Sequence, residues 1–214
     1  MASETEALAQ AKKSGKPVEV LAQRGEAREV FATADGNLET REYLRPVWTR
    51  SGEGWEHVDT TLARQGDGTI APAATTVKLA FSGGGAEEPL VRMERAGRAA
   101  SLTWPASLPA PVLDGAVATY PSVLPGVDLR MTAQEDGFSQ LLVVKTAEAA
   151  QSEELAELRL KLGTEGLDVE ETSQGGLRAV DSGAGGTVFE APQPLMWDSS
   201  EGDAQTAQPP TSLA

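Results

Sequence analysis

The sequence predicts a mainly β protein, built as an antiparallel, β-sandwich-like fold with a short N-terminal helix and one short internal helix. Three observations lead to this fold class. About a dozen short apolar runs follow one another at roughly ten-residue spacing, and turn residues separate them, a pattern that favours an antiparallel sandwich over βαβ units. With 214 residues, 40% of them hydrophobic, the chain is long enough for one large core or two small ones.

The N-terminal segment, residues 1–15, is predicted to be a helix or linker. Ser3 and Glu6 have the spacing of a capping box, in which each side chain accepts a hydrogen bond from the other residue's backbone N–H. Residues of good helix propensity follow until Gly15, so the pattern predicts a helix over about residues 4–14. Leu8 is its only large apolar side chain, which predicts weak docking.

Residues 16–104 are predicted to form a first β-rich lobe. Val77, Leu79 and Phe81 alternate with polar or small neighbours, as half-buried strands do. Turn chemistry separates the runs at Asp35-Gly36, Ser51 to Gly54 and Gly66 to Gly68. The glycines that follow Ser82 predict a flexible hairpin loop, because the Lys and the Ser or Thr of a phosphate-binding loop are missing.

The stretch 105–112 carries three prolines and is predicted to connect this lobe to a second one, residues 113–198. There Val127, Leu129 and Met131 alternate with polar residues, and Asp136-Gly137 predicts a hairpin turn. Leu141 to Val144 is a run of four apolar residues. Such a run predicts a strand that is covered on both faces.

The rest of the second lobe is predicted to hold a short helix and four more strands. Ser152 precedes an acidic first turn, which predicts a helix at about residues 151–157. Alternation predicts a strand from Leu158 to Leu162, followed by strands around Leu167, Leu177 and Val188. Residues 199–214 have almost no apolar content and predict a disordered linker toward a downstream domain.

Charge and cysteine content exclude several classes of function. The formal net charge of −14 disfavours nucleic acid or an anionic bilayer as primary partner, and we expect no membrane insertion. The absence of Cys excludes disulfides, thiolate catalysis and Cys-bound metals. Met1 to Lys16 lack the apolar region of a signal peptide, which predicts a cytosolic protein or one whose leader has been removed.

Candidate catalytic residues are few. His57, the single His, lies two residues from Asp59, so on one predicted strand both would project from the same face and serve a metal or a Ser-His-Asp set. No third member is recognisable, and we expect an exposed His57 on a hairpin. Paired acids suggest a glycosidase, but turns and helix starts explain them: Glu87-Glu88, Glu135-Asp136, Glu153-Glu154 and Glu170-Glu171. We therefore expect no catalytic residue, no cofactor and no metal ligand; the Asp-Gly turns lack a calcium-loop pattern.

Four tryptophans offer the alternative of sugar binding, because exposed aromatic rings stack on sugar faces. Most tryptophans of a β-rich chain are core anchors that bury a large area. Trp55 is the exception we expect, since it opens a strand beside a glycine-rich turn. It is the predicted contact for a carbohydrate or cell-wall ligand.

The segment from Tyr120 to Val144 carries a family resemblance. It reads Y-P-S-V-L-P-G-V-D-L-R, then D-G-F and L-L-V-V-K, and the chain later ends a strand with F-E-A-P-Q-P-L-M-W-D. Residues 16–200 thereby resemble the N-terminal β-rich region of large secreted actinobacterial proteins. In that family the region precedes laminin-G-like jelly-roll domains, or Rhs/YD-repeat shells of the wall-associated and polymorphic-toxin type.

The resemblance implies a secreted or cell-surface protein and assigns no catalytic residues. It marks structural motif residues instead, which are expected to shape turns and strand ends: Tyr120, Pro121, Pro125, Gly126, Asp128, Asp136, Gly137, Pro192, Pro194 and Trp197.

Three functions follow as hypotheses. The first is a non-catalytic structural and docking domain whose partners are the downstream domains of its own parent chain or another surface protein. The second is a module that binds cell-wall glycan through Trp55. The third is a hydrolase that uses His57 with carboxylates.

Overall fold

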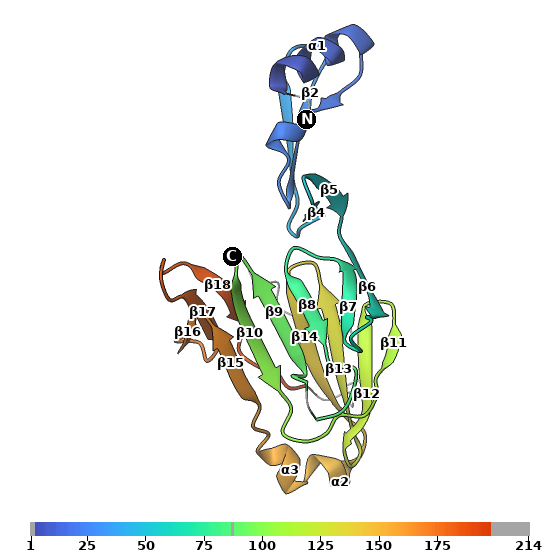
Figure 1. Cartoon of the computed structure of the whole chain (residues 1–214), viewed down its shortest axis with the longest axis vertical. Helices are drawn as coiled ribbons and strands as arrows, with labels where there is room; N and C mark the ends of the chain where they lie inside the picture. The colour runs from blue at the N-terminus through green and yellow to red at the C-terminus, as the bar shows by residue number, and fades with distance from the viewer. Residues whose placement is uncertain (1–2, 87, 198–214) are drawn as a thin grey trace. The chain divides into compact units, whose positions relative to one another are not determined.

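The computed structural model describes residues 3–86 and 88–197 (Figure 1). Glu87 and the predicted linker 199–214 lie outside the described residues. The described chain forms two compact units, one of residues 3–95 and 101–163 and the other of residues 96–100 and 164–197. Several antiparallel sheets dominate, which confirms the predicted mainly β, sandwich-like fold.

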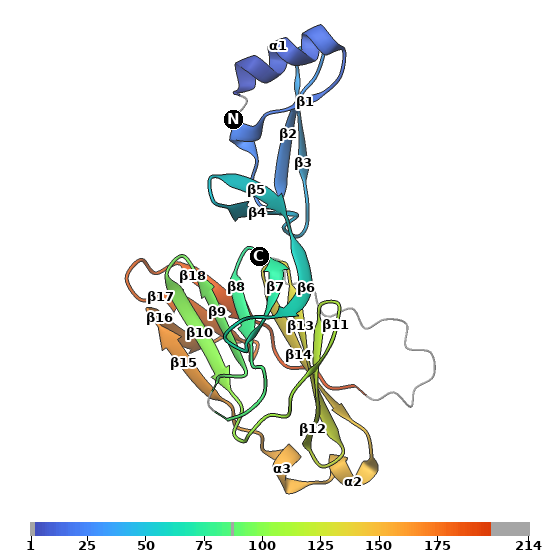
Figure 2. The same cartoon turned by 45° about the vertical axis from the view of Figure 1, so that its right-hand side comes forward.

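The N-terminal helix α1 (Glu4–Ser14) forms as its sequence predicts. Ser3 and Glu6 make the capping box, and Gly15 ends the helix with a φ of 70°. Ala7 and Ala11 lie fully buried against a small sheet of order β1-β2-β3 (Figure 2). Its strands are β1 (Val18–Glu19), β2 (Arg28–Ala32) and β3 (Leu38–Glu42), and a 3₁₀ turn, η1 (Leu21–Gln23), separates the first two. The predicted Asp35-Gly36 turn joins β2 to β3.

A two-stranded hairpin follows, β4 (Trp48–Ser51) with β5 (Gly54–His57). The chain then builds a six-stranded sheet of order β15-β10-β9-β8-β7-β6. Its strands are β6 (Asp59–Arg64), β7 (Ile70–Ala74), β8 (Lys78–Phe81), β9 (Val91–Arg95), β10 (Arg98–Thr103) and β15 (Lys161–Glu165). The Pro-rich stretch 105–112 lies within the first unit, where Leu108 is buried and bridges Gly85.

A second sheet, of four strands in the order β11-β12-β13-β14, lies within the first unit. Its strands are β11 (Val112–Asp114), β12 (Val117–Leu124), β13 (Val127–Gln134) and β14 (Gly137–Val144). Phe81 of β8 meets Phe138 of β14 edge to face at 6.2 Å between ring centroids, so the two sheets pack against each other. Val127, Leu129 and Met131 of β13 are at most 1% exposed, and burial of each stabilises the fold by about 1.5–3 kcal/mol.

Strand β14 differs from its prediction. The run Leu141 to Val144 was expected to be covered on both faces, but β14 ends the sheet, and Leu141 and Val144 are 36% and 40% exposed. A short run of apolar residues alone does not show that both faces of its strand are covered. After β14, α3 (Glu153–Ala156) lies within the helix predicted at about residues 151–157, and a further single turn that was not predicted, α2 (Ala147–Ala150), precedes it. The next strand, β15, starts at Lys161 rather than at Leu158.

The loop after Ser82 is also tighter than the flexible hairpin expected. A Cβ at Gly83 would lie 2.0 Å from the Gly68 carbonyl oxygen, so only glycine allows this backbone approach. Ser82 itself is 1% exposed, and its hydroxyl accepts a hydrogen bond from the Gly84 N–H. The glycines serve packing in the fold.

The second unit contains a three-stranded sheet of order β16-β17-β18. Its strands are β16 (Leu167–Glu171), β17 (Leu177–Asp181) and β18 (Thr187–Ala191). Arg98 pairs with Asp181 at 2.9 Å, and the pKa of Asp181 is lowered, first by hydrogen bonds from the Ala184 and Gly183 N–H groups and then by Arg98. No helix within the described residues is long and apolar enough to span a membrane.

Candidate functional site

A stack of three side chains occupies the junction of the N-terminal sheet and the β4–β5 hairpin. Trp48 and His57 are cross-strand partners, and their rings stack with centroids 3.8 Å apart. The Arg24 guanidinium lies over the Trp48 ring at 3.7 Å, a cation–π contact. Arg24 also forms an ion pair with Glu19 of β1, in which Nε donates to Oε1 at 2.7 Å. His57 and Arg24 thus both occupy ring surface of Trp48 that a sugar would otherwise contact.

Glu29 of β2 is the buried acid of this junction, with 9% of its surface exposed. Its Oε2 accepts from the Tyr43 hydroxyl at 2.7 Å, and its Oε1 accepts from the Trp48 indole N–H at 3.0 Å. The Tyr43 hydrogen bond is the main cause that lowers the pKa of Glu29, although burial opposes it. The same bond raises the pKa of Tyr43. Glu29 is thus an ionised carboxylate with both oxygens occupied, an arrangement that anchors the hairpin.

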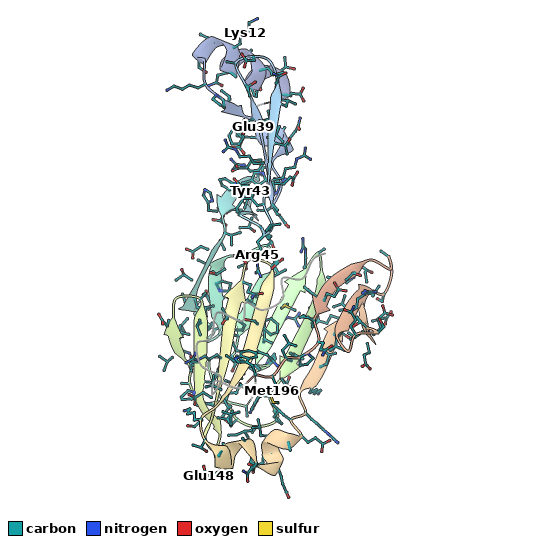
Figure 3. All side chains as sticks on the ribbon, turned by 180° about the vertical axis from the view of Figure 1, so that it is seen from behind. Lys12, Glu39, Tyr43, Arg45, Glu148 and Met196 are labelled. Carbon is teal, nitrogen blue, oxygen red and sulfur yellow. The ribbon has the colours of Figure 1, made fainter. Side chains whose placement is uncertain are left out.

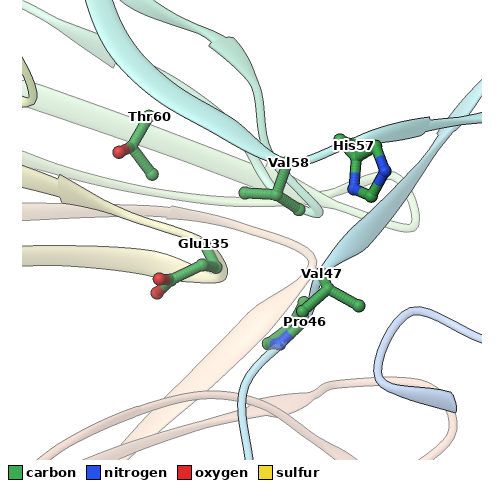
Figure 4. A pocket seen from close by; sticks show the side chains of 6 residues that line it. All are labelled: Pro46, Val47, His57, Val58, Thr60 and Glu135. Atoms are coloured by element: carbon green, nitrogen blue, oxygen red, sulfur yellow. The ribbon is translucent and has the colours of Figure 1, made fainter. Parts of the chain in front are cut away.

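An open pocket of about 270 Å³ lies beside this stack (Figure 4). Pro46, Val47, His57, Val58, Thr60 and Glu135 line it. Figure 4 shows the Glu135 carboxylate pointing away from the His57 ring. That carboxylate pairs with Arg45 at 3.1 Å. The pocket is therefore lined by the single His and by one acid, Glu135, whose charge is balanced by Arg45.

His57 lies exposed on the β4–β5 hairpin, as expected, whereas the alternative that places His57 and Asp59 on one strand is wrong. His57 ends β5 and Asp59 begins β6, so the two do not share one strand. The Asp59 carboxylate accepts a hydrogen bond from the Thr61 N–H at 2.9 Å. Hydrogen bonds from Thr61 lower the pKa of Asp59. The Asp59 carboxylate therefore makes a local contact at the start of β6. Within residues 3–86 and 88–197, no group of three or more His, Asp or Glu side chains is placed to hold a metal ion.

Trp55 lies on β5 opposite Arg50 and is half-buried. The Arg50 guanidinium lies 3.9 Å from the ring centroid and occupies one ring face. Trp104 is 5% exposed and Trp197 is 59% exposed. Trp104 is thus buried, Trp48 and Trp55 are half-buried, and Trp197 is exposed.

The motif from Tyr120 onward shapes one end of the sandwich. Tyr120 is fully buried, and its hydroxyl donates to the Ser82 carbonyl at 2.6 Å. Burial raises its pKa. Pro121 and Pro125 are exposed beside it, and the register of β12 with β13 shifts between Tyr120 and Leu124. Tyr120 thus ties the two sheets together.

Asp128 holds the bulge that follows Tyr120. Ser122 has a φ of 52°, a conformation that costs a non-glycine residue energy. Its N–H donates to Asp128 Oδ1 at 2.7 Å, and Lys145 pairs with the same oxygen at 2.6 Å. Lys145 and then Ser122 lower the pKa of Asp128. Next to this bulge, Gly126 has a φ of 72° and lies close to Ala149.

The remaining motif residues lie at turns and exposed ends. Asp136 is exposed in the β13–β14 turn, and Gly137 opens β14. Pro192, Pro194 and Trp197 follow β18 and are exposed. In the second unit, an open pocket of about 360 Å³ lies on the sheet face that carries Asp168, Glu170 and Arg178. Arg178 pairs there with Glu190 at 3.1 Å and with Glu170 at 3.8 Å.

Sequence reasoning did not single out Glu29. Its signal was weak: Glu29 and Phe31 share one face of a short strand, while Val30 and Ala32 share the other. An acid between apolar neighbours on a strand indicates that both faces are covered, and an acid in that position needs hydrogen-bond donors. Tyr43 and Trp48 supply them from 14 and 19 residues away.

Comparison with known proteins finds no relative of this chain. No protein-family model, curated protein or solved structure matches this chain.

Proposed function

We propose that the chain is a non-catalytic structural and docking domain at the N-terminus of a larger secreted or cell-surface protein of the toxin-delivery or wall-associated type. One observation supports the proposal: the charged side chains of the clusters around Glu29 and Asp128 form internal hydrogen bonds and ion pairs that stabilise the fold. Glu29 anchors a hairpin, and Asp128 holds a bulge with Lys145. The Glu29 carboxylate, whose two oxygens both accept internal hydrogen bonds, is unsuited to abstract a substrate proton.

The docking partner in this proposal is the downstream region of the same parent chain. The test is a calorimetric titration of the purified chain with that region. Saturable binding is the expected result. Because a net charge of −14 attracts basic proteins without specificity, the control is an unrelated protein of similar acidity. No heat of binding at high micromolar concentration contradicts the docking role.

The second candidate is a carbohydrate or cell-wall module, and the partial exposure of the half-buried Trp55 favours it. Arg50 lies over one face of the Trp55 ring, and a guanidinium beside an aromatic ring suits a ligand that offers both a sugar face and hydroxyl acceptors. A peptidoglycan pull-down tests this function. Retention that is lost in Trp55→Ala and kept in Trp197→Ala supports it, and no retention of the unaltered chain rules it out.

A further inference from the structure

Strand β14 presents a long, regular and open sheet edge. It pairs with β13 through eight successive residues, from Gly137 opposite Gln134 to Val144 opposite Val127, without a register shift. Among residues 3–86 and 88–197, no strand lies on its other side, since β14 ends the order β11-β12-β13-β14. The unbroken register keeps this edge straight enough to accept a further strand.

The free hydrogen-bonding groups of this edge belong to alternate residues. The Lys145 N–H donates to the Gly126 carbonyl at 2.8 Å and so points toward β13. In an antiparallel ladder, direction alternates along the strand. The N–H and C=O groups that point outward are therefore those of Phe138, Gln140, Leu142 and Val144. Within the described part of the chain, these groups have no hydrogen-bond partner.

The composition of β14 also sets it apart. Gly137 to Val144 reads G-F-S-Q-L-L-V-V, with no charge and no proline. Every other strand at a sheet edge among the described residues contains at least one charged residue: β1, β3, β4, β5, β6, β11, β15, β16 and β18. Charges on edge strands prevent pairing with other chains. β14 lacks this protection at the longest of the edges.

We propose that β14 is a self-association interface, at which two copies of the chain pair antiparallel about a twofold axis at Leu141. This register brings residues of like face together. Phe138, which contacts Phe81 on the inner side, lies opposite Val144 of the second copy. Leu141, on the outer side, lies opposite itself, and the pair joins two four-stranded sheets into one of eight strands.

Charge complementarity favours a second copy as the occupant. The eight-residue strand brings no charge against its own copy. At each end of the new pair, Lys145 of one copy lies opposite Gly137 and hence one residue from Asp136 of the other. The net charge of −14 opposes association at long range, but salt screens that repulsion. The dimer is therefore expected to strengthen as salt concentration rises.

A single cysteine tests the register, because the chain has none of its own. In this register Leu141 forms a non-hydrogen-bonded pair with itself, with Cα atoms about 4.5 Å apart, a distance that a disulfide spans. Leu141→Cys is expected to form a covalent dimer under mild oxidation much faster than Val112→Cys, on the opposite edge of the sheet, or Ser139→Cys, which faces Val143. Equal rates for the three variants contradict the proposal.

Sedimentation equilibrium tests the interface without a cross-link. The unaltered chain is expected to dimerise, and Leu141→Lys, which sets like charges opposite each other, to raise the dimer dissociation constant about tenfold or more. Leu141 is 36% exposed, so the fold tolerates Lys there. Val112→Lys, at a residue 65% exposed, is the matched control and leaves the dimer unchanged. A chain that stays monomeric at millimolar concentration, or a dimer that Leu141→Lys does not weaken, overturns the proposal.

Discussion

At the scale of the residue, Glu29 connects the N-terminal sheet to the segment that follows it. Tyr43 and Trp48 both donate to its carboxylate, and Figure 3 shows Tyr43 and Arg45 in the segment after β3. Because Trp48 also stacks on Arg24 and His57, the position of one carboxylate orients a whole aromatic group. The His57 ring is held by Trp48, and this contact gives it a structural role.

Replacing Glu29 by Gln is expected to destabilise the chain by about 1–2 kcal/mol. The amide presents one acceptor where the carboxylate presents two, so Tyr43 or Trp48 loses a charge-assisted hydrogen bond. Urea unfolding followed by Trp fluorescence measures the change. Glu39→Gln, an exposed acid on β3, is the control and changes the free energy of unfolding little. Equal stability of the two variants contradicts the anchoring role of Glu29.

Gly126 is a second residue with a specific requirement. Its φ is 72°, and an added Cβ would lie 2.9 Å from the Ala149 Cβ. Gly126→Ala is expected to cost about 1–2 kcal/mol from the backbone conformation, plus the cost of the contact. Gly115→Ala separates the two causes, because Gly115 has a φ of 55° and open space around it. Thermal unfolding that shows the larger loss for Gly115→Ala contradicts this account.

At the scale of the element, α1 packs through small side chains. Ala7 and Ala11 are fully buried where the helix meets β1 and β2, so the helix backbone approaches the sheet closely. The sequence predicts weak docking of this helix, because Leu8 is its only large apolar residue. The burial of Ala7 and Ala11 shows that the helix contacts the sheet through close approach of its backbone and not through large side chains.

Enlarging one of these alanines is expected to destabilise the N-terminal region. Ala11→Leu inserts three carbons into a packed contact, at a cost of about 1–3 kcal/mol. Ala9→Leu, on the exposed face of the same helix, adds the same group without overpacking. Hydrogen exchange of the β2 amides measures the outcome. If the two variants protect β2 equally, α1 does not pack as described.

Local signals predicted local structure well. The capping box of Ser3 and Glu6 and the stop at Gly15 placed α1 residue by residue, and Asp-Gly pairs placed the turns before β3 and β14. These signals depend on neighbours a few residues apart. The edge position of β14 depends on strand order in the sheet, and the Glu29 contacts join segments 14 and 19 residues apart. The strand order leaves no local pattern, and Glu29 leaves only a weak one, an acid between apolar neighbours on a strand.

At the scale of the whole molecule, ionised carboxylates support both compact units. In the first unit, Asp128 is held by Lys145 and Ser122. In the second, Asp181 accepts from the Gly183 and Ala184 N–H groups and pairs with Arg98. The pKa of each carboxyl is lowered. A fall in pH is therefore expected to lower the stability of both units.

The sign of the pH dependence follows from the lowered pKa values. A carboxyl whose pKa is lower in the folded than in the unfolded chain contributes stability above its unfolded value, near 3.8 for Asp. This contribution is lost as the pH falls through the folded pKa. Asp128→Asn is expected to cost about 1–2 kcal/mol at pH 7 and to approach the unaltered chain as the pH falls below the folded pKa, where Asp128 is itself neutral.

Urea unfolding at a series of pH values from 7 to 2 checks this expectation. Asp136→Asn is the control, because Asp136 is exposed in the β13–β14 turn, at the other end of β13, and forms no ion pair or side-chain hydrogen bond among the described residues. Asp181→Asn is expected to shift the acid sensitivity of the second unit and to leave that of the first unchanged. A difference between Asp128→Asn and the unaltered chain that stays constant down to pH 2 contradicts the assignment. In that case the carboxylate charge of Asp128 does not stabilise the bulge, and Asn holds Ser122 less well for reasons of geometry.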